Sequence, residues 1–211
     1  LLIEKYLQAI YSRKEVELER DRVDLGAPSG SRYLVLPKPA RELLTICVAW
    51  RMSGINAKNS ISRAEISTMI GDIYDEFLLL CKSENVSQDI VEGLSIFEKK
   101  YAKETFADKV QILTTEICTA GLLIPDPAGG DSNLRFPHKQ FFEYLICKSV
   151  CICSQFSDSG IAKLILKASS SKNLYASLAE EPNSISYLAE CVGVDLTQIF
   201  TKQERVMVKC S

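Results

Sequence analysis

The feature that most constrains the fold is a succession of apolar stripes with helical spacing. In each stripe the apolar residues recur every three or four positions, as on one face of an α-helix. The stripes are Ile66, Met69, Ile70, Ile73, Phe77 and Leu80, then Ile90, Leu94, Phe97 and Tyr101, then Val110, Leu113 and Ile117. Ser62 and Glu65 form a capping-box pattern in front of the first stripe, which marks where that helix starts. The sequence therefore predicts a mainly α-helical protein.

One segment carries a β pattern. Two short apolar runs, 122–124 and 134–136, flank a stretch with two prolines and two glycines. Such runs on either side of a glycine-rich connection are typical of a β-hairpin, here with a long loop. A further helix is expected over 138–153. Three helices followed by this hairpin have the outline of a winged helix.

Further helices are expected on both sides of this region. A helical spacing begins at Ile3 and continues through a mixed-charge run over 13–22, interpreted as a solvated face. A loop is predicted over 25–31 because two glycines and a proline occur there. Pro39 then precedes a helix over 40–52 whose apolar residues on nearly all sides predict burial, and Gly54 is expected to end it. Short helices are predicted over 161–168, 174–180, 185–191 and 195–200.

Composition and charge exclude several classes of protein. The chain is 46% hydrophobic and 25% charged, which is ordinary for a globular protein and argues against disorder. Its net charge of -2 gives no field that would attract a polyanion, so no nucleic-acid or membrane partner is expected. No signal peptide is recognisable, and no apolar run approaches the about 20 residues that span a bilayer. We expect a cytoplasmic location and a chain cut from a longer protein.

The eight cysteines favour reduced thiols in a cytosolic core over a disulfide framework, because most lie within apolar helical patterns. Cys147, Cys151 and Cys153 are close enough together to raise the question of a metal. However, no CxxC pair occurs and His138 is the only histidine, so no zinc-finger spacing can be assembled. We expect no metal site.

No motif of an enzyme is present. A GxxxxGK[ST] loop is absent, and Gly129-Gly130 lacks the lysine that such a loop requires. Serine or cysteine catalysis would have to use His138, yet no GxSxG or comparable element accompanies it. The chain is therefore not expected to be an enzyme by itself.

The winged-helix outline invites a DNA-binding interpretation, which charge can test. A helix that enters the major groove usually brings basic or amide side chains to the bases and phosphates. The helix over 105–120 has Lys109 against Asp108 and Glu116. This pattern favours packing against protein, and DNA binding is kept as the weaker alternative.

Two stretches carry a resemblance to a known family. They are Gly121-Leu122-Leu123 and Phe136-Pro137-His138-Lys139-Gln140-Phe141-Phe142-Glu143-Tyr144-Leu145. Together they resemble the winged-helix signature of NACHT-type (NOD-like receptor) proteins, which are STAND-class regulatory ATPases. Residues 39–80 also look similar to the family's first helical domain. Phe142 departs from the pattern where the family often has glutamine, and Ile146-Cys147 replaces the usual alanine pair.

The resemblance implies a division into three parts. Residues 1–85 are expected to be the end of the ATPase core and the first helical domain, 86–155 the winged-helix domain, and 156–211 the start of a second helical domain. In such proteins the winged-helix histidine contacts the phosphate of bound ADP and locks the resting state, and a proline contacts the base. By position these residues are His138 and Pro39.

As a whole, the resemblance implies the regulatory part of a nucleotide-dependent signalling switch in innate immunity. ADP or ATP would be bound only together with a P-loop ATPase domain that this chain lacks, the parent would be a slow ATPase, and activation would lead to a homo-oligomer. Each residue also has a structural interpretation: His138 can cap its own helix, and Pro39 can simply start one. The alternative function is a stand-alone helical adaptor that binds protein through residues 158–200 and binds no nucleotide.

Overall fold

A computed structural model describes residues 2–24, 36, 38–56, 59–80, 82, 88–119, 122–129, 133–155, 186–187 and 191 of the chain. This part is mainly helical with a small antiparallel sheet, which confirms the predicted fold class. The helices are α1 (Leu2–Asp24), α2 (Lys38–Asn56), α3 (Arg63–Leu80), α4 (Gln88–Lys100), α5 (Phe106–Thr119) and α6 (Lys139–Gln155). The strands are β1 (Ile61–Ser62), β2 (Ile124–Pro125) and β3 (Asn133–Arg135). The predicted loop over 25–31 and almost all of the helices predicted beyond residue 158 lie outside the described residues.

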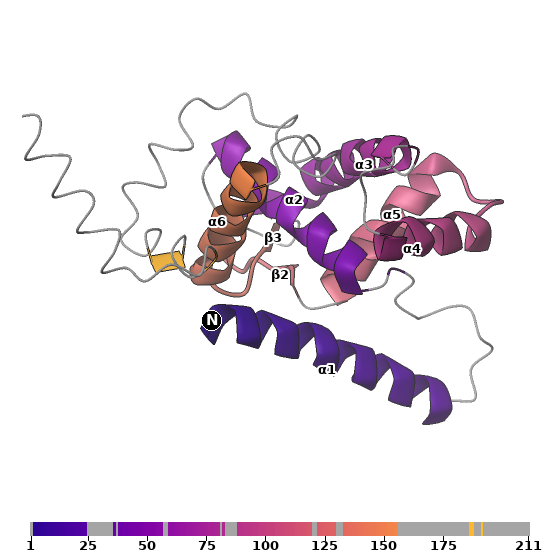
Figure 1. Ribbon diagram of the computed structural model, residues 1–211, viewed down its shortest axis with the longest axis horizontal. Coiled ribbons are helices and arrows are strands. Elements are labelled where there is room, and N and C mark those ends of the chain that lie inside the picture. The colour runs from indigo at the N-terminus through magenta and orange to yellow at the C-terminus, as the bar shows by residue number, and fades with distance from the viewer. Residues whose placement is uncertain are drawn as a thin grey trace, which may run out of the picture.

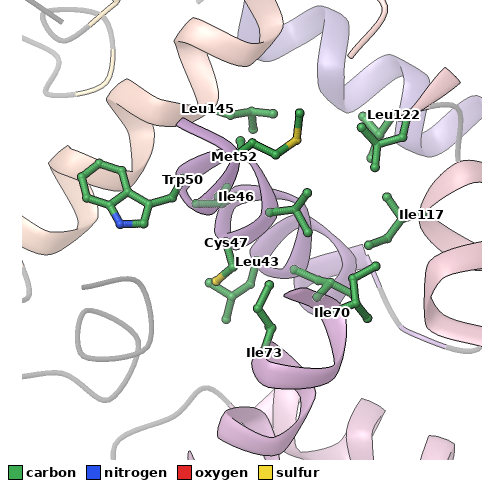
Figure 2. Close-up of a cluster of buried hydrophobic side chains, with 14 of the residues drawn as sticks. Leu43, Ile46, Cys47, Trp50, Met52, Ile70, Ile73, Ile117, Leu122 and Leu145 are labelled. Carbon is green, nitrogen blue, oxygen red and sulfur yellow. The ribbon is translucent and has the colours of Figure 1, made fainter. Parts of the chain in front are cut away.

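Helix α2 is the centre of the hydrophobic core. Figure 2 shows its side chains surrounded by apolar residues from other elements, among them Ile73 of α3, Ile117 of α5 and Leu145 of α6. Val48 has no exposed surface, and Trp50 is only 2% exposed. The predicted burial of this helix on nearly all sides is confirmed.

The end of α2 differs from the prediction. The helix continues through Gly54 to Asn56 instead of ending at the glycine. A glycine inside a helix costs about 1 kcal/mol relative to alanine. The buried turns that precede Gly54 offset a cost of this size.

Local capping explains where α3 and α5 begin. The Ser62 hydroxyl accepts a hydrogen bond from the Glu65 amide at 3.2 Å, and the Glu65 carboxylate accepts one from the Ser62 amide at 3.1 Å. This confirms the predicted capping box. Thr105 and Asp108 repeat the same reciprocal pair at the start of α5, at 3.2 and 3.3 Å.

The sheet has three antiparallel strands in the order β1-β3-β2. The predicted hairpin is present: β2 pairs with β3 through Ile124 opposite Arg135. The third strand, β1, was not predicted, and it pairs with β3 through Ile61 opposite Leu134. A strand of two residues is too short to show the alternation by which strands are recognised.

This sheet joins segments that were expected to belong to different domains. Strand β1 lies before residue 85 and β2 and β3 lie after it. Helix α2 likewise packs mainly against α6, from across the same expected boundary. The boundaries near residues 85 and 155 stay predictions, but the two segments share one sheet and one core.

Helix α1 lies along one side of this core, as Figure 1 shows, and its N-terminal half packs against α6. Leu7 and Tyr11 are almost fully buried there, at 3% and 1% exposure. The predicted first helix is thereby confirmed. None of the helices in the described part of the chain has both the length and the hydropathy needed to cross a bilayer.

The carboxylate of Glu116 in α5 is buried, whereas the comparison with DNA-binding helices treated it as a surface charge. Glu116 is 6% exposed. Its carboxylate accepts a hydrogen bond from the Leu36 amide at 2.8 Å and lies 3.9 Å from the Arg41 guanidinium, which is also buried. Lys109 is 2.8 Å from Glu98 of α4. Glu116 and Lys109 of α5 thus both serve contacts within the protein.

Candidate functional site

The hairpin leads directly to His138, which lies at the start of α6. Strand β3 ends at Arg135, and His138 is the residue immediately before the helix. Its carbonyl accepts hydrogen bonds from the amides of Phe141 and Phe142 at 3.0 and 3.4 Å. His138 therefore occupies the capping position through its backbone, which leaves the imidazole for other contacts.

The imidazole is exposed and touches one aromatic ring. It meets Phe141 edge-on, with the ring centroids 5.1 Å apart and an interplanar angle of 89°. Phe141 is itself buried and packs against Tyr6 of α1 at 5.3 Å. The ring contacts orient His138 without enclosing it.

The start of α6 carries two exposed basic side chains, His138 and Lys139. No acidic residue occupies the first turn of this 17-residue helix, and Lys139 is its first residue. Lys139 is more than half exposed, although its ammonium also lies 3.1 Å from Glu143 one turn further on. A helix N-terminus carries partial positive charge and binds anions with its amides. An imidazole and an ammonium at this end suit a phosphate group.

The backbone before His138 is clamped by a side chain that the sequence analysis missed. The Asn59 amide group accepts a hydrogen bond from the Phe136 N–H at 2.9 Å and donates one to the Phe136 carbonyl at 3.0 Å. Asn59 thus pairs with Phe136 as a neighbouring strand would, just before β1. No sequence signal links the two residues because they are 77 positions apart.

The base of the hairpin is fixed by a second polar group, centred on Asp126. Its carboxylate accepts hydrogen bonds from the Ser60 hydroxyl at 2.5 Å and the Ala128 amide at 3.1 Å, and Arg135 lies 3.7 Å away. The hydrogen bond from Ser60 lowers the pKa of Asp126 below its ordinary value. This ionised carboxylate ties the residue before β1 to the turn after β2.

Pro39 lies in the first turn of α2 and is exposed. This is the helix position where proline is best tolerated, because an amide there has no partner within the helix. The structure therefore agrees with the structural interpretation of Pro39 and also leaves its ring accessible. A contact with a base stays a prediction.

An ionic cluster docks α1 onto the core beside this site. Lys148 of α6 lies 3.0 Å from Glu4 of α1 and 2.5 Å from Glu42 of α2. Tyr144 donates a hydrogen bond to Glu4, and Gln8 contacts both carboxylates. Three helices that are distant in the sequence meet at one ammonium group.

Within the described residues, no group of three or more His, Cys, Asp or Glu side chains is arranged to hold a metal ion. Comparison of the chain with protein-family models, curated proteins and solved structures found no match. The assignment of a function therefore depends on the residues and geometry described above.

Proposed function

We propose that this chain is the regulatory, helical and winged-helix part of a NACHT-type signalling switch. In the resting state ADP bridges a P-loop ATPase domain of the same protein and the start of α6, where His138 donates a hydrogen bond to the phosphate. Exchange for ATP releases this contact and frees surfaces that form a homo-oligomer. The chain itself carries no catalytic group, the parent protein is a slow ATPase, and the setting is cytoplasmic innate-immune sensing.

The observation that carries the proposal is how the motif at 136–145 divides between core and surface. Its aromatic residues are buried: Phe136, Phe141, Phe142 and Tyr144 have at most 6% exposure, as expected for core positions. His138, Lys139 and Gln140 are exposed side by side at the helix start. The residue that contacts the phosphate in the resembled family, His138 by position, is therefore in the accessible part of the motif.

The proposal is tested in the full-length protein with His138→Ala and, as a matched control, Gln140→Ala. Loss of one hydrogen bond to a charged group weakens binding by about 1.5–3 kcal/mol, or roughly 10- to 150-fold. We expect His138→Ala to lose co-purified ADP and to shift toward the oligomer, and Gln140→Ala to behave as the unchanged protein. Nucleotide content is measured by extraction and chromatography, and oligomeric state by light scattering.

The stability of both variants has to be measured together with their nucleotide content and oligomeric state. Because the imidazole is exposed, His138→Ala should change the free energy of unfolding by less than about 0.5 kcal/mol. Retained ADP and a retained resting state in a folded His138→Ala protein would contradict the proposal. So would the absence of a GxxxxGK[ST] loop after a strand in the 300 or so residues encoded upstream of Leu1.

The adaptor alternative depends on residues 158–200, of which the structure describes only 186–187 and 191. No observation in the described part of the chain favours it over the switch. If the protein is an adaptor that binds no nucleotide, His138→Ala should change neither the nucleotide content nor the oligomeric state.

A further inference from the structure

A separate cluster of thiols lies further along α6 and plays no part in the proposed nucleotide contact. Cys147 and Cys151 are one turn apart on this helix and are buried, at 0% and 4% exposure. Cys191 is partly buried and packs against the same core. All three are thiols rather than disulfide sulfurs.

Two of these thiols, Cys151 and Cys191, are in hydrogen-bond contact although they are 40 positions apart. A second contact supports the same placement. Tyr144 of α6 meets Tyr187 edge-on, with ring centroids 6.0 Å apart and an interplanar angle of 84°. Tyr144 also shares a side-chain hydrogen bond with Cys191. Both Tyr187 and Cys191 therefore contact α6.

The thiol pair is polarised. The hydrogen bond from Cys191 lowers the pKa of Cys151 below its ordinary value. The same hydrogen bond, together with burial, raises the pKa of Cys191. Because the thiolate is the reactive form of cysteine, we expect Cys151 to be the thiol of this pair that reacts first.

We propose that Cys151 and Cys191 form a reversible disulfide when the protein meets a hydroperoxide, so that oxidation ties position 191 covalently to α6. The inference does not depend on nucleotide binding.

The reaction is balanced in two steps. The Cys151 thiolate attacks one oxygen of hydrogen peroxide, the O–O bond breaks, and the departing hydroxide takes up a proton as water, leaving a sulfenic acid. The Cys191 sulfur then attacks the Cys151 sulfur, and a second water leaves. Two thiols and one peroxide give one disulfide and two waters, with the sulfur atoms closing to about 2.0 Å. A dithiol reductant reverses the bond.

The test uses the natively folded protein, treated with a small excess of hydrogen peroxide and then blocked with iodoacetamide. Trypsin places Cys151 in the peptide 149–163 and Cys191 in the peptide 173–202. We expect mass spectrometry to find these two peptides cross-linked, thiol titration to show a loss of two thiols, and dithiothreitol to restore both. The oxidised protein should melt several degrees higher, because a cross-link restricts the unfolded chain.

The peptide 149–163 also contains Cys153, which provides the matched control. Cys153→Ser should keep the cross-link, whereas Cys151→Ser and Cys191→Ser should each abolish it. A native, oxidised protein without this cross-link, or with Cys191 joined to Cys153 or Cys147, would overturn the proposal. Fragment ions that separate Cys151 from Cys153 within the cross-linked peptide 149–163 decide the question on the unchanged protein, even if a serine variant does not fold.

Discussion

At the scale of single residues, the ion pair between Arg41 and Glu116 is a point where one substitution should be costly. Both side chains are almost fully buried, and Glu116 also accepts the Leu36 amide. Removal of one partner leaves a charge in the core. We expect Glu116→Ala to lower the free energy of unfolding by about 3–5 kcal/mol in urea titration. Glu116→Gln keeps an acceptor for Leu36 and should cost clearly less, and equal losses would show that the charge is unimportant.

Asn59 is the second residue whose role follows from one side chain. Asn59→Ala removes both hydrogen bonds to Phe136 and should lower the free energy of unfolding by about 1–3 kcal/mol. Asn59→Asp keeps the acceptor for the Phe136 amide but loses the donor, so an intermediate loss is expected. Thermal and urea unfolding measure both. If Asn59→Ala left the free energy of unfolding unchanged, the two hydrogen bonds between Asn59 and Phe136 would not stabilise the fold.

At the scale of elements, the docking of α1 depends on ionisation. Burial alone would raise the pKa of Glu4, but the hydrogen bond from Tyr144 and the charge of Lys148 lower it below 4.5. Burial opposes the charge of Lys148, yet Glu42 and Glu4 raise its pKa above 10.5. Glu4 thus contributes stability above about pH 4.5 that is lost as the pH falls through its lowered value. Lys148 contributes below about pH 10.5, and its contribution is lost as the pH rises further.

Glu4→Gln should therefore be less stable than the unchanged protein at about pH 7, with a difference that shrinks toward about pH 3. Urea unfolding at a series of pH values, followed by circular dichroism, measures this difference. Asp75→Asn, which removes an exposed carboxylate of α3, serves as the control. A difference that is constant with pH would show that Glu4 acts only by packing.

At the scale of the whole molecule, the shared sheet and core predict which part folds alone. Residues 86–155 contain β2, β3 and α6 but lack β1 and α2, against which they pack. Expressed alone, this segment would expose the apolar face of α6 and should not unfold cooperatively. Residues 36–155 should show one cooperative transition. Calorimetry of both distinguishes these outcomes, and a cooperative transition in 86–155 would indicate an independent winged-helix domain.

The sequence by itself determined most of the local structure. The helical stripes, the capping box at Ser62 and the glycine-rich hairpin were predictable because each depends on residues within a few positions of one another. The burial of the aromatic residues around His138 followed from the same periodicity. The motif at 136–145 also singles out His138, which lies exposed just before α6.

Only the tertiary structure decided the contacts that join distant segments. The pairing of β1 with β3, the clamp of Asn59 on Phe136 and the burial of Glu116 connect residues more than 70 positions apart. So does the meeting of Glu4 with Lys148, while Cys151 and Cys191 are 40 positions apart. Local propensities carry no information about such partners, because their energy arises only when packing removes both groups from water. The sequence pattern predicts whether a charged group or thiol lies at the surface or in the core. Its partner, and therefore what it does, depends on which side chain the fold places beside it.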